Sequence, residues 1–226
     1  MKKRVFYREI AYVFAVITLA FGAAFAELAS FGMSMVVAPA YILHLKLSEL
    51  LPWFTFGVAE YVVECALVLL IVIIMRRFKL SYLFSFVTAI VYGTCLDGAI
   101  FLLSFIPNEA LALRIVWFIL GMTLTSTGVS LFFHTYISPA PYELIVKEIS
   151  KEYSLDINKT KITYDAISTI VSIVFSFVFF GFFTFRGVGI GTIILAVVNG
   201  WLIGRISKVF EHFFDFKDKF NFAKYF

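Results

Sequence analysis

Long blocks of apolar residues, separated by short polar stretches, run along the whole chain. Apolar and polar positions do not alternate as they would on a half-exposed helix or strand. A run of about 18 or more apolar residues is typical of a membrane-spanning helix. The pattern predicts six such helices, at about 10–37, 53–75, 80–106, 112–133, 163–185 and 188–208. We therefore predict an all-α integral membrane protein that forms a single membrane domain over residues 1–226.

The composition supports this fold class. The chain is 62% hydrophobic and 15% charged, whereas a soluble domain carries about 25% charged residues. Mean hydropathy is +0.95. The lipid bilayer is therefore the first partner that the sequence predicts.

The basic residues predict the orientation. With a cytoplasmic N-terminus and six crossings, only Lys46, Arg114 and Arg186 of the 19 Lys and Arg residues fall outside cytoplasmic segments. Cationic segments translocate poorly, so this asymmetry predicts that both termini are cytoplasmic. We expect a multi-pass protein of a prokaryotic cytoplasmic (inner) membrane. Topology then explains the net charge of +4, and no nucleic-acid partner is needed.

The N-terminal segment has one alternative interpretation. Its basic start and the small residues at Ala24-Phe25-Ala26 are also features of a cleaved secretory signal. However, the apolar stretch continues to about Leu43, which is longer than a signal core. We expect the segment to stay as the first spanning helix.

A glycine-rich stretch, RGVGIGTIILAVVNGWLIG, occupies residues 186–204. A dinucleotide-binding loop would follow a strand in a soluble βαβ unit, and no strand, acidic ribose partner or phosphate-loop lysine is present. Glycines in membrane helices instead let neighbouring helices approach closely. We predict helix-packing roles for Gly189, Gly191, Thr192, Gly200 and Gly204.

The two halves of the chain show weak internal similarity. Residues 81–98 align with 188–204, which places Gly93 over Gly200. Residues 31–41 align with 127–142, which places Gly32 over Gly128 and Ser34 over Ser130, and Glu60 falls near Asp165. The matches predict two three-helix repeats, at about 10–106 and 112–208, followed by a cytoplasmic tail, 209–226, along the inner leaflet.

An odd number of crossings per repeat inverts the second copy in the membrane. Inverted repeats are the architecture of many secondary transporters, with the solute site near the midplane between the halves. Duplication without any transport function is the simpler alternative.

The glycine-rich stretch, Asp165 some twenty residues before it, and ISPAPYELIVKEIS at 137–150 together resemble the YczE/YyaS/YitT group of bacterial integral membrane proteins. Asp97, at the end of IVYGTCLDG, fits the first-half version of the pattern. Phe84-Ser85 departs from it, because Gly-Thr is expected there. The resemblance implies an integral membrane fold and no particular activity.

Several carboxylates interrupt the apolar blocks. Each costs about 2.5–3.5 kcal/mol at the bilayer centre even on the most lenient insertion scale, and no span contains a central Lys or Arg to neutralise them. Such a cluster favours protons or a cationic solute. The alternative is that each is protonated and bonded to a neighbouring Ser, Thr or Tyr. Our candidates for solute or proton binding are Glu27, Glu60, Glu64, Asp97, Asp165 and Asn199.

Two shorter segments, at 38–53 and 138–161, have a proline at their second position. The second carries an apolar stripe, which is typical of a helix on the membrane surface or under the bundle. Alternatively, both are re-entrant helices whose N-terminal dipoles face the site.

The sequence favours a secondary transporter of a small cationic or proton-coupled solute. We find no paired nucleophile and base, no metal motif and no cofactor loop, so we expect neither an enzyme nor a cofactor. One alternative is the substrate-binding subunit of a multi-component vitamin importer, because AYVFA at 11–15 resembles the Ala-x-x-x-Ala contact motif of such subunits. The other is a non-transporting regulatory or scaffolding protein. A homo-oligomer or an energising partner subunit is compatible with these functions.

Overall fold

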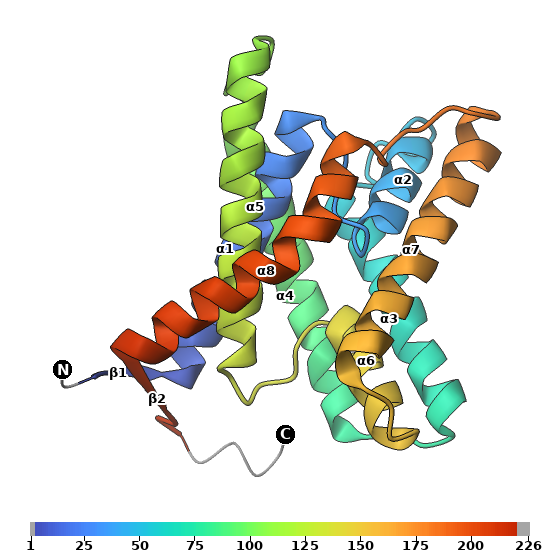
Figure 1. Ribbon diagram of the computed structural model, residues 1–226. Coiled ribbons are helices and arrows are strands. Elements are labelled where there is room, and N and C mark those ends of the chain that lie inside the picture. Colours follow the sequence, from blue (N-terminus) through green and yellow to red (C-terminus); the bar gives the residue numbers. More distant parts are fainter. Residues whose placement is uncertain (1–2, 221–226) are drawn as a thin grey trace.

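The computed structural model describes residues 3–220 and is almost entirely helical (Figure 1). In chain order its elements are β1 (Arg4–Tyr7), α1 (Arg8–Ala29), α2 (Ala38–Leu47), α3 (Phe56–Met75), α4 (Leu80–Leu103), α5 (Leu111–Phe133), α6 (Pro141–Glu152), α7 (Ile157–Phe180), α8 (Ile190–Phe213) and β2 (Phe214–Lys217). Within the described residues, six helices are long and apolar enough to cross a membrane: α1, α3, α4, α5, α7 and α8. The predicted fold class is confirmed in this respect.

The first helix is shorter than predicted. It ends at Ala29, eight residues before the expected boundary, because the backbone of Ser30 turns into the left-handed region (φ 55°). The segment that follows is fixed to the loop before α8, since Met33 N–H donates to the Gly187 carbonyl at 3.0 Å. A Cβ on Gly32 would lie 2.5 Å from the Gly189 backbone nitrogen, so this approach requires glycine.

Helices α1 and α5 pack against each other and share the most extensive helix–helix interface among the described residues (Figure 1). Their backbones meet through small residues. A Cβ on Gly22 would lie 2.4 Å from Thr125 Oγ1, and one on Gly121 would lie 2.8 Å from the Gly22 carbonyl oxygen. Small residues let membrane helices gain van der Waals contacts over their whole length.

The remaining helix contacts fall into matching pairs. Helix α4 packs on α1 while α8 packs on α5, and the short helices α2 and α6 each pack on both α3 and α7. Two copies, α1–α4 and α5–α8, would produce such matching contacts, and the repeat itself stays a prediction. The alignment of Gly32 with Gly128 is wrong, however, because Gly32 lies in a loop and Gly128 lies inside α5 against α1.

The contact between α3 and α4 breaks the match. Helices α3 and α4 pack closely, and a Cβ on Gly57 would lie 2.4 Å from the Gly93 carbonyl oxygen. In the part of the chain that the structure describes, α7 and α8 share no comparable interface, and α8 runs obliquely away from α7 (Figure 1).

Only some of the residues with a predicted helix-packing role are in close contact with another segment. Gly189 and Gly191 approach Phe31, and Thr192 is buried and accepts the N–H of Gly189 at 3.1 Å. By contrast, an added Cβ at Gly200 or Gly204 would meet no atom within 4 Å. The packing role expected for these last two is therefore wrong for this conformation, because α7 stands away from them.

Helix α6 lies inside the bundle alongside α3. It begins where Tyr142 Oη donates to Glu60 Oε2 at 2.6 Å, and it ends at the α3–α4 turn, where Lys79 pairs with Glu148. Twelve residues of helix span about 18 Å, so α6 follows most of the length of α3. Burial opposes ionisation of Glu148, but hydrogen bonds from Lys79 and Tyr82 hold its pKa below the ordinary glutamate value.

Helix α2 occupies the corresponding place at the opposite end of the bundle. It begins at the buried Ala38-Pro39-Ala40 segment and ends at a charged group, in which Lys46 Nζ and Glu49 Oε2 are 2.8 Å apart. Arg186, in the loop before α8, lies 3.9 Å from the same carboxylate group.

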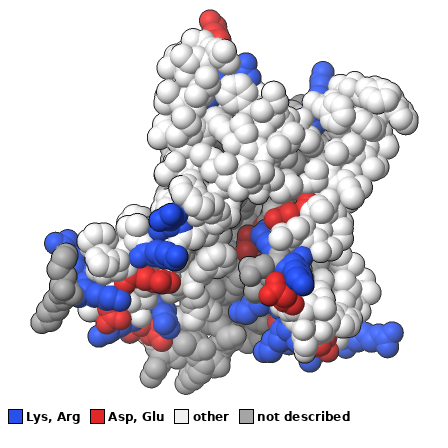
Figure 2. Space-filling model, viewed as in Figure 1, with Lys and Arg blue, Asp and Glu red and all other residues white. Residues whose placement is uncertain are grey.

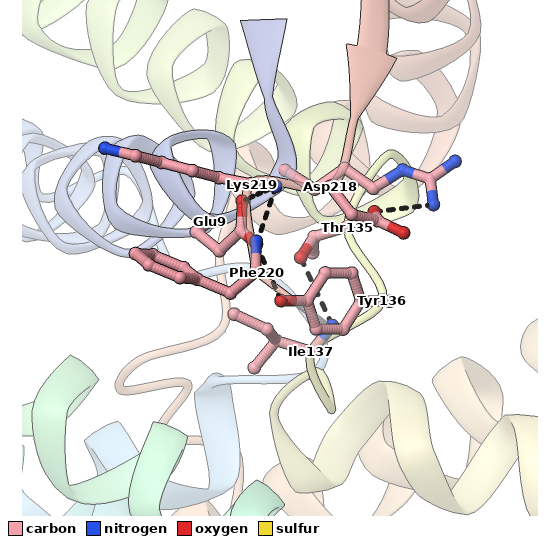
Figure 3. Close-up of polar contacts among 8 residues, drawn as sticks. Glu9, Thr135, Tyr136, Ile137, Asp218, Lys219 and Phe220 are labelled. Atoms are coloured by element: carbon pink, nitrogen blue, oxygen red, sulfur yellow. Dashed lines mark hydrogen bonds and ion pairs between the residues drawn. The ribbon is translucent and has the colours of Figure 1, made fainter. Parts of the chain in front are cut away.

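The two ends of the described chain meet in a parallel ribbon, with Arg4 opposite Phe214 and Tyr7 opposite Lys217. Beside it, Glu9 accepts hydrogen bonds from Phe220 N–H at 2.9 Å and from Tyr136 Oη at 2.8 Å (Figure 3). The predicted tail therefore begins as the last turns of α8 and strand β2. Residues 221–226 lie outside the described residues.

Charged side chains gather over the half of the molecule that carries the termini, α6 and the start of α7, and are sparse over the opposite half (Figure 2). The positive-inside rule would place the charged half in the cytoplasm. The predicted orientation stays a prediction on this basis.

Candidate functional site

A cavity of about 420 Å³ lies between two groups of helices. Helices α1, α5 and α8 form one wall, and α3, α4, α6 and α7 form the other, together with the segment just before α2. Its polar and charged lining residues are Ser34, Glu64, Thr88, Tyr92, Thr125, Tyr142, Glu143, Lys161, Asp165 and Asn199. Both halves of the chain line this cavity, but its walls do not coincide with the halves, because α1 shares one wall with α5 and α8. A solute site between the two halves stays a prediction.

Glu64 is the most unusual residue of this wall. It is fully buried, and within residues 3–220 neither of its carboxylate oxygens has a hydrogen-bond partner. Glu60, one turn earlier, is also fully buried, but its Oε2 accepts the bond from Tyr142. Buried polar groups are nearly always paired, so an unpaired glutamate at a cavity wall points to a ligand or a proton.

Asp165 reaches the cavity as part of an ion pair. Lys161 Nζ lies 2.8 Å from Asp165 Oδ1, one turn away on α7, and both residues line the cavity. The expectation that the carboxylates have no built-in counter-charge is therefore wrong for Asp165. The sequence pattern predicts Lys161 in a cytoplasmic connection, whereas in the structure it belongs to the spanning helix.

Glu143 adds a further acid from α6. Burial raises the pKa of its carboxyl above the ordinary value, and nearby Lys161 partly opposes this effect. Because Glu64, Glu143 and Asp165 line the cavity with Lys161 as the cationic residue among its lining side chains, the lining carries an excess of acidic groups.

Asn199 lies on the opposite wall, on α8. Its side-chain oxygen accepts a hydrogen bond from Ser126 Oγ of α5 at 2.5 Å. On the first wall, Thr88 of α4 donates to the Ser138 carbonyl just before α6 at 3.0 Å. These bonds fix polar groups on both sides of the cavity.

Glu27 and Asp97 are not brought into the cavity. Asp97 binds the start of α3, where its Oδ1 accepts Gly57 N–H at 2.8 Å and its Oδ2 accepts Thr55 Oγ1 at 2.6 Å. A carboxylate at a helix N-terminus is stabilised by the free N–H groups and the helix dipole. Asp97 therefore acts on α3 packing, and Glu27, with Oε2 unpartnered, lies outside the cavity lining.

The starts of the two short helices converge on the cavity. Residues 34–37, just before α2, and Ala140, Tyr142 and Glu143, at the start of α6, all line it. The re-entrant alternative considered for both segments is the one that this geometry supports, because the positive ends of their dipoles face the carboxylates.

Sequence reasoning missed Tyr142, Glu143 and Lys161. The proline-led start of α6 and the four-residue spacing of Lys161 and Asp165 are visible in the sequence. Neither feature distinguishes a helix inside the bundle from one on the membrane surface, since both can begin with proline and carry charged residues.

The comparisons with known proteins give a family and no function. The family described as "Family of unknown function (DUF6198)" matches residues 6–208. The chain belongs to this family. No curated protein and no solved structure matches the chain. The DUF6198 match contains every residue that lines the cavity, while the likeness to the YczE/YyaS/YitT group stays a resemblance.

Proposed function

We propose that this polytopic membrane protein is a secondary transporter of a small cationic or proton-coupled solute in a cytoplasmic membrane, with both termini inside. The observation that carries the proposal is Glu64, which is fully buried and unpartnered at the wall of a cavity between two helix groups. Intramembrane acids that face a cavity are typical of solute and proton pathways.

The unequal helix pairs support a transport cycle. Helices α3 and α4 are packed together while α7 and α8 are apart, so one side of the bundle is closed and the other is open. In a protein with inverted repeats, the opposite state packs α7 on α8 and separates α3 from α4. Under the predicted orientation, the described state opens towards the cytoplasm.

The first test is thermal unfolding of the purified protein in detergent with a panel of amino acids, amines, sugars, vitamins and metal cations at two pH values. A ligand at a hundred times its Kd should stabilise the protein by about 2.7 kcal/mol. Stabilisation that is lost in Glu64→Gln and kept in Glu27→Gln would tie the ligand to the cavity. A ligand that stabilises wild type and Glu64→Gln equally would contradict a role for Glu64.

The second test is flux of the stabilising solute into proteoliposomes. Gly200→Leu should block closure of α7 on α8 and reduce flux, because Gly200 faces open space in the described state. Gly98→Leu, on α4 and also without a neighbour within 4 Å, is the matched control and should keep flux. Equal flux in both variants would contradict the proposed closure.

The importer-subunit alternative loses its sequence support. Ala11 and Ala15, the two alanines of the candidate contact motif, are fully buried inside the chain, so they are not available to a partner subunit. Flux by the purified chain alone would exclude that alternative, and also the purely regulatory one.

A further inference from the structure

The unpartnered carboxylate of Glu64 lacks hydrogen-bond donors while titratable groups surround it. Those that interact with it electrostatically are Glu60 from α3, Tyr92 from α4, and Tyr142 and Glu143 from α6. From α7, Lys161 and Asp165 line the same cavity, and Tyr164 lies near Glu143 and Glu60. Helix α2 presents Tyr41 and His44 beside Phe56, two turns before Glu64. The base of this set, Lys161, is already paired with Asp165. Glu64 therefore needs donors from outside the protein.

Most of the lining on α5 and α8 is apolar, with Thr125 and Asn199 as its polar residues. Val129, Phe132, Leu195 and Ile203 line the cavity from α5 and α8, across from Glu64 on α3. A ligand that fills this space must present N–H donors and positive charge at one end and an apolar body at the other. A primary ammonium ion with a hydrocarbon substituent has this shape.

A bare metal ion fits this site less well. Hard cations take six or more oxygen ligands, and transition metals need several His, Cys or carboxylate ligands. Within residues 3–220 no group of three or more His, Cys, Asp and Glu side chains is placed to hold a metal. An anion is disfavoured by the excess of acidic groups in the lining.

We propose that Glu64 is a single site for which a proton and a primary ammonium ion with an apolar body compete, so that the protein exchanges one for the other. The inference rests on the proposed transport function and specifies its substrate class and coupling. When the ammonium binds, the Glu64 carboxyl gives its proton to water on the side to which the cavity opens, and the ammonium N–H groups donate to the carboxylate.

Competition follows from burial. An ionised carboxylate without a partner is unfavourable in a buried site, so an empty site must take up a proton. A bound ammonium supplies both charge and hydrogen bonds, and the proton is then no longer needed. The N-termini of α2 and α6, which face the cavity, favour the ionised form that binds the ammonium.

The test is isothermal titration of the detergent-purified full chain with ethyl-, butyl-, hexyl- and 2-phenylethylammonium, repeated in buffers of different ionisation enthalpy. 2-Phenylethanol and phenylacetate serve as neutral and anionic controls. We expect 2-phenylethylammonium to bind, with release of about one proton and a Kd that rises about tenfold for each unit by which the pH falls. Glu64→Gln should lose binding, and Glu27→Gln should keep it.

Three results would overturn the proposal: none of the four ammonium ions binds, one binds without proton release, or Glu64→Gln binds as tightly as wild type. If Glu64→Gln does not fold, the wild-type protein still tests the proposal, because ammonium binding must release a proton and its Kd must rise as the pH falls. Flux of a neutral solute without ammonium binding would leave transport standing and overturn this inference. Ammonium binding with proton release but no flux would support the site and contradict transport.

Discussion

The third and fourth helices are packed together in the first half of the chain (α3 and α4) and separated in the second half (α7 and α8). On α4, Ala89 is fully buried and Gly93 is in contact with the ring of Tyr61 from α3. On α8, the aligned Ala196 and Gly200 line the cavity, and Gly200 has no neighbour for a Cβ. The same four-residue spacing of small residues is a packed interface in one half and an open wall in the other.

Small residues in a membrane helix create a surface on which another helix can pack closely. Whether a helix packs there depends on the position of the neighbouring helix, α3 in the first half and α7 in the second. In a two-state transporter the unpacked surface is where the next state forms its contacts.

Gly57→Ala should have the largest effect on stability. Its Cβ would lie 2.4 Å from the Gly93 carbonyl oxygen and 2.6 Å from Asp97 Oδ2, so α3 and α4 must separate. Overpacking of this kind costs about 1–3 kcal/mol, visible as a lower midpoint of thermal unfolding in detergent. Gly98→Ala, with no atom within 4 Å, is the control. Equal midpoints for the two variants would show that the α3–α4 contact is not tight.

Tyr142→Phe should have the next largest effect. It removes the donor to the fully buried Glu60 and leaves both of that carboxyl's oxygens without a partner. The loss of stability should be about 1–3 kcal/mol, at the lower end if Glu60 takes up a proton. Combined with Glu60→Gln in a double-mutant cycle, the variant should show coupling, and additive losses would contradict the contact.

Glu148→Gln tests the contact that holds α6 to the α3–α4 turn. Because the pKa of Glu148 is lowered on folding, its stabilisation is fully present above the ordinary glutamate pKa of about 4.3 and is lost as the pH falls through the lowered value. The wild type should exceed the variant by about 1 kcal/mol or less at pH 7. The gap should close in acid, and a gap that widens there would contradict the assignment.

Gly200→Ala should have the smallest effect. An added methyl group meets no atom within 4 Å, so stability should stay within about 0.5 kcal/mol of wild type. Thermal unfolding beside Gly57→Ala measures both halves in one assay. A midpoint reduced as much as that of Gly57→Ala would mean that α7 already packs on α8 in solution.

The spanning helices and the key acid could be predicted from the sequence because both depend on the solvent. Apolar length alone identifies a span, and the energetic cost of Glu64 in such a span marks it as unusual. The early end of α1 could not be predicted, since it depends on Gly32 meeting Gly189, which is more than 150 residues away along the chain.

The different roles of the candidate acidic residues could be distinguished only in the folded structure. Asp97 and Glu64 look alike in the sequence, but Asp97 binds the N-terminus of α3 while Glu64 has no donor. The depth of α6 was missed for a related reason. Its polar residues suit a surface helix, and only the contact between Tyr142 and Glu60 shows that it begins inside the bundle.

Strands β1 and β2 lie side by side in the parallel ribbon, so the two ends of the described residues, 3–220, are close together. A covalent link across the ribbon would leave the path of the backbone unchanged, and new ends could be opened in the connection at 104–110, between the halves and largely exposed. In such a circular permutant the two halves would be synthesised in reverse order. The gene could then be rearranged to ask which half must enter the membrane first.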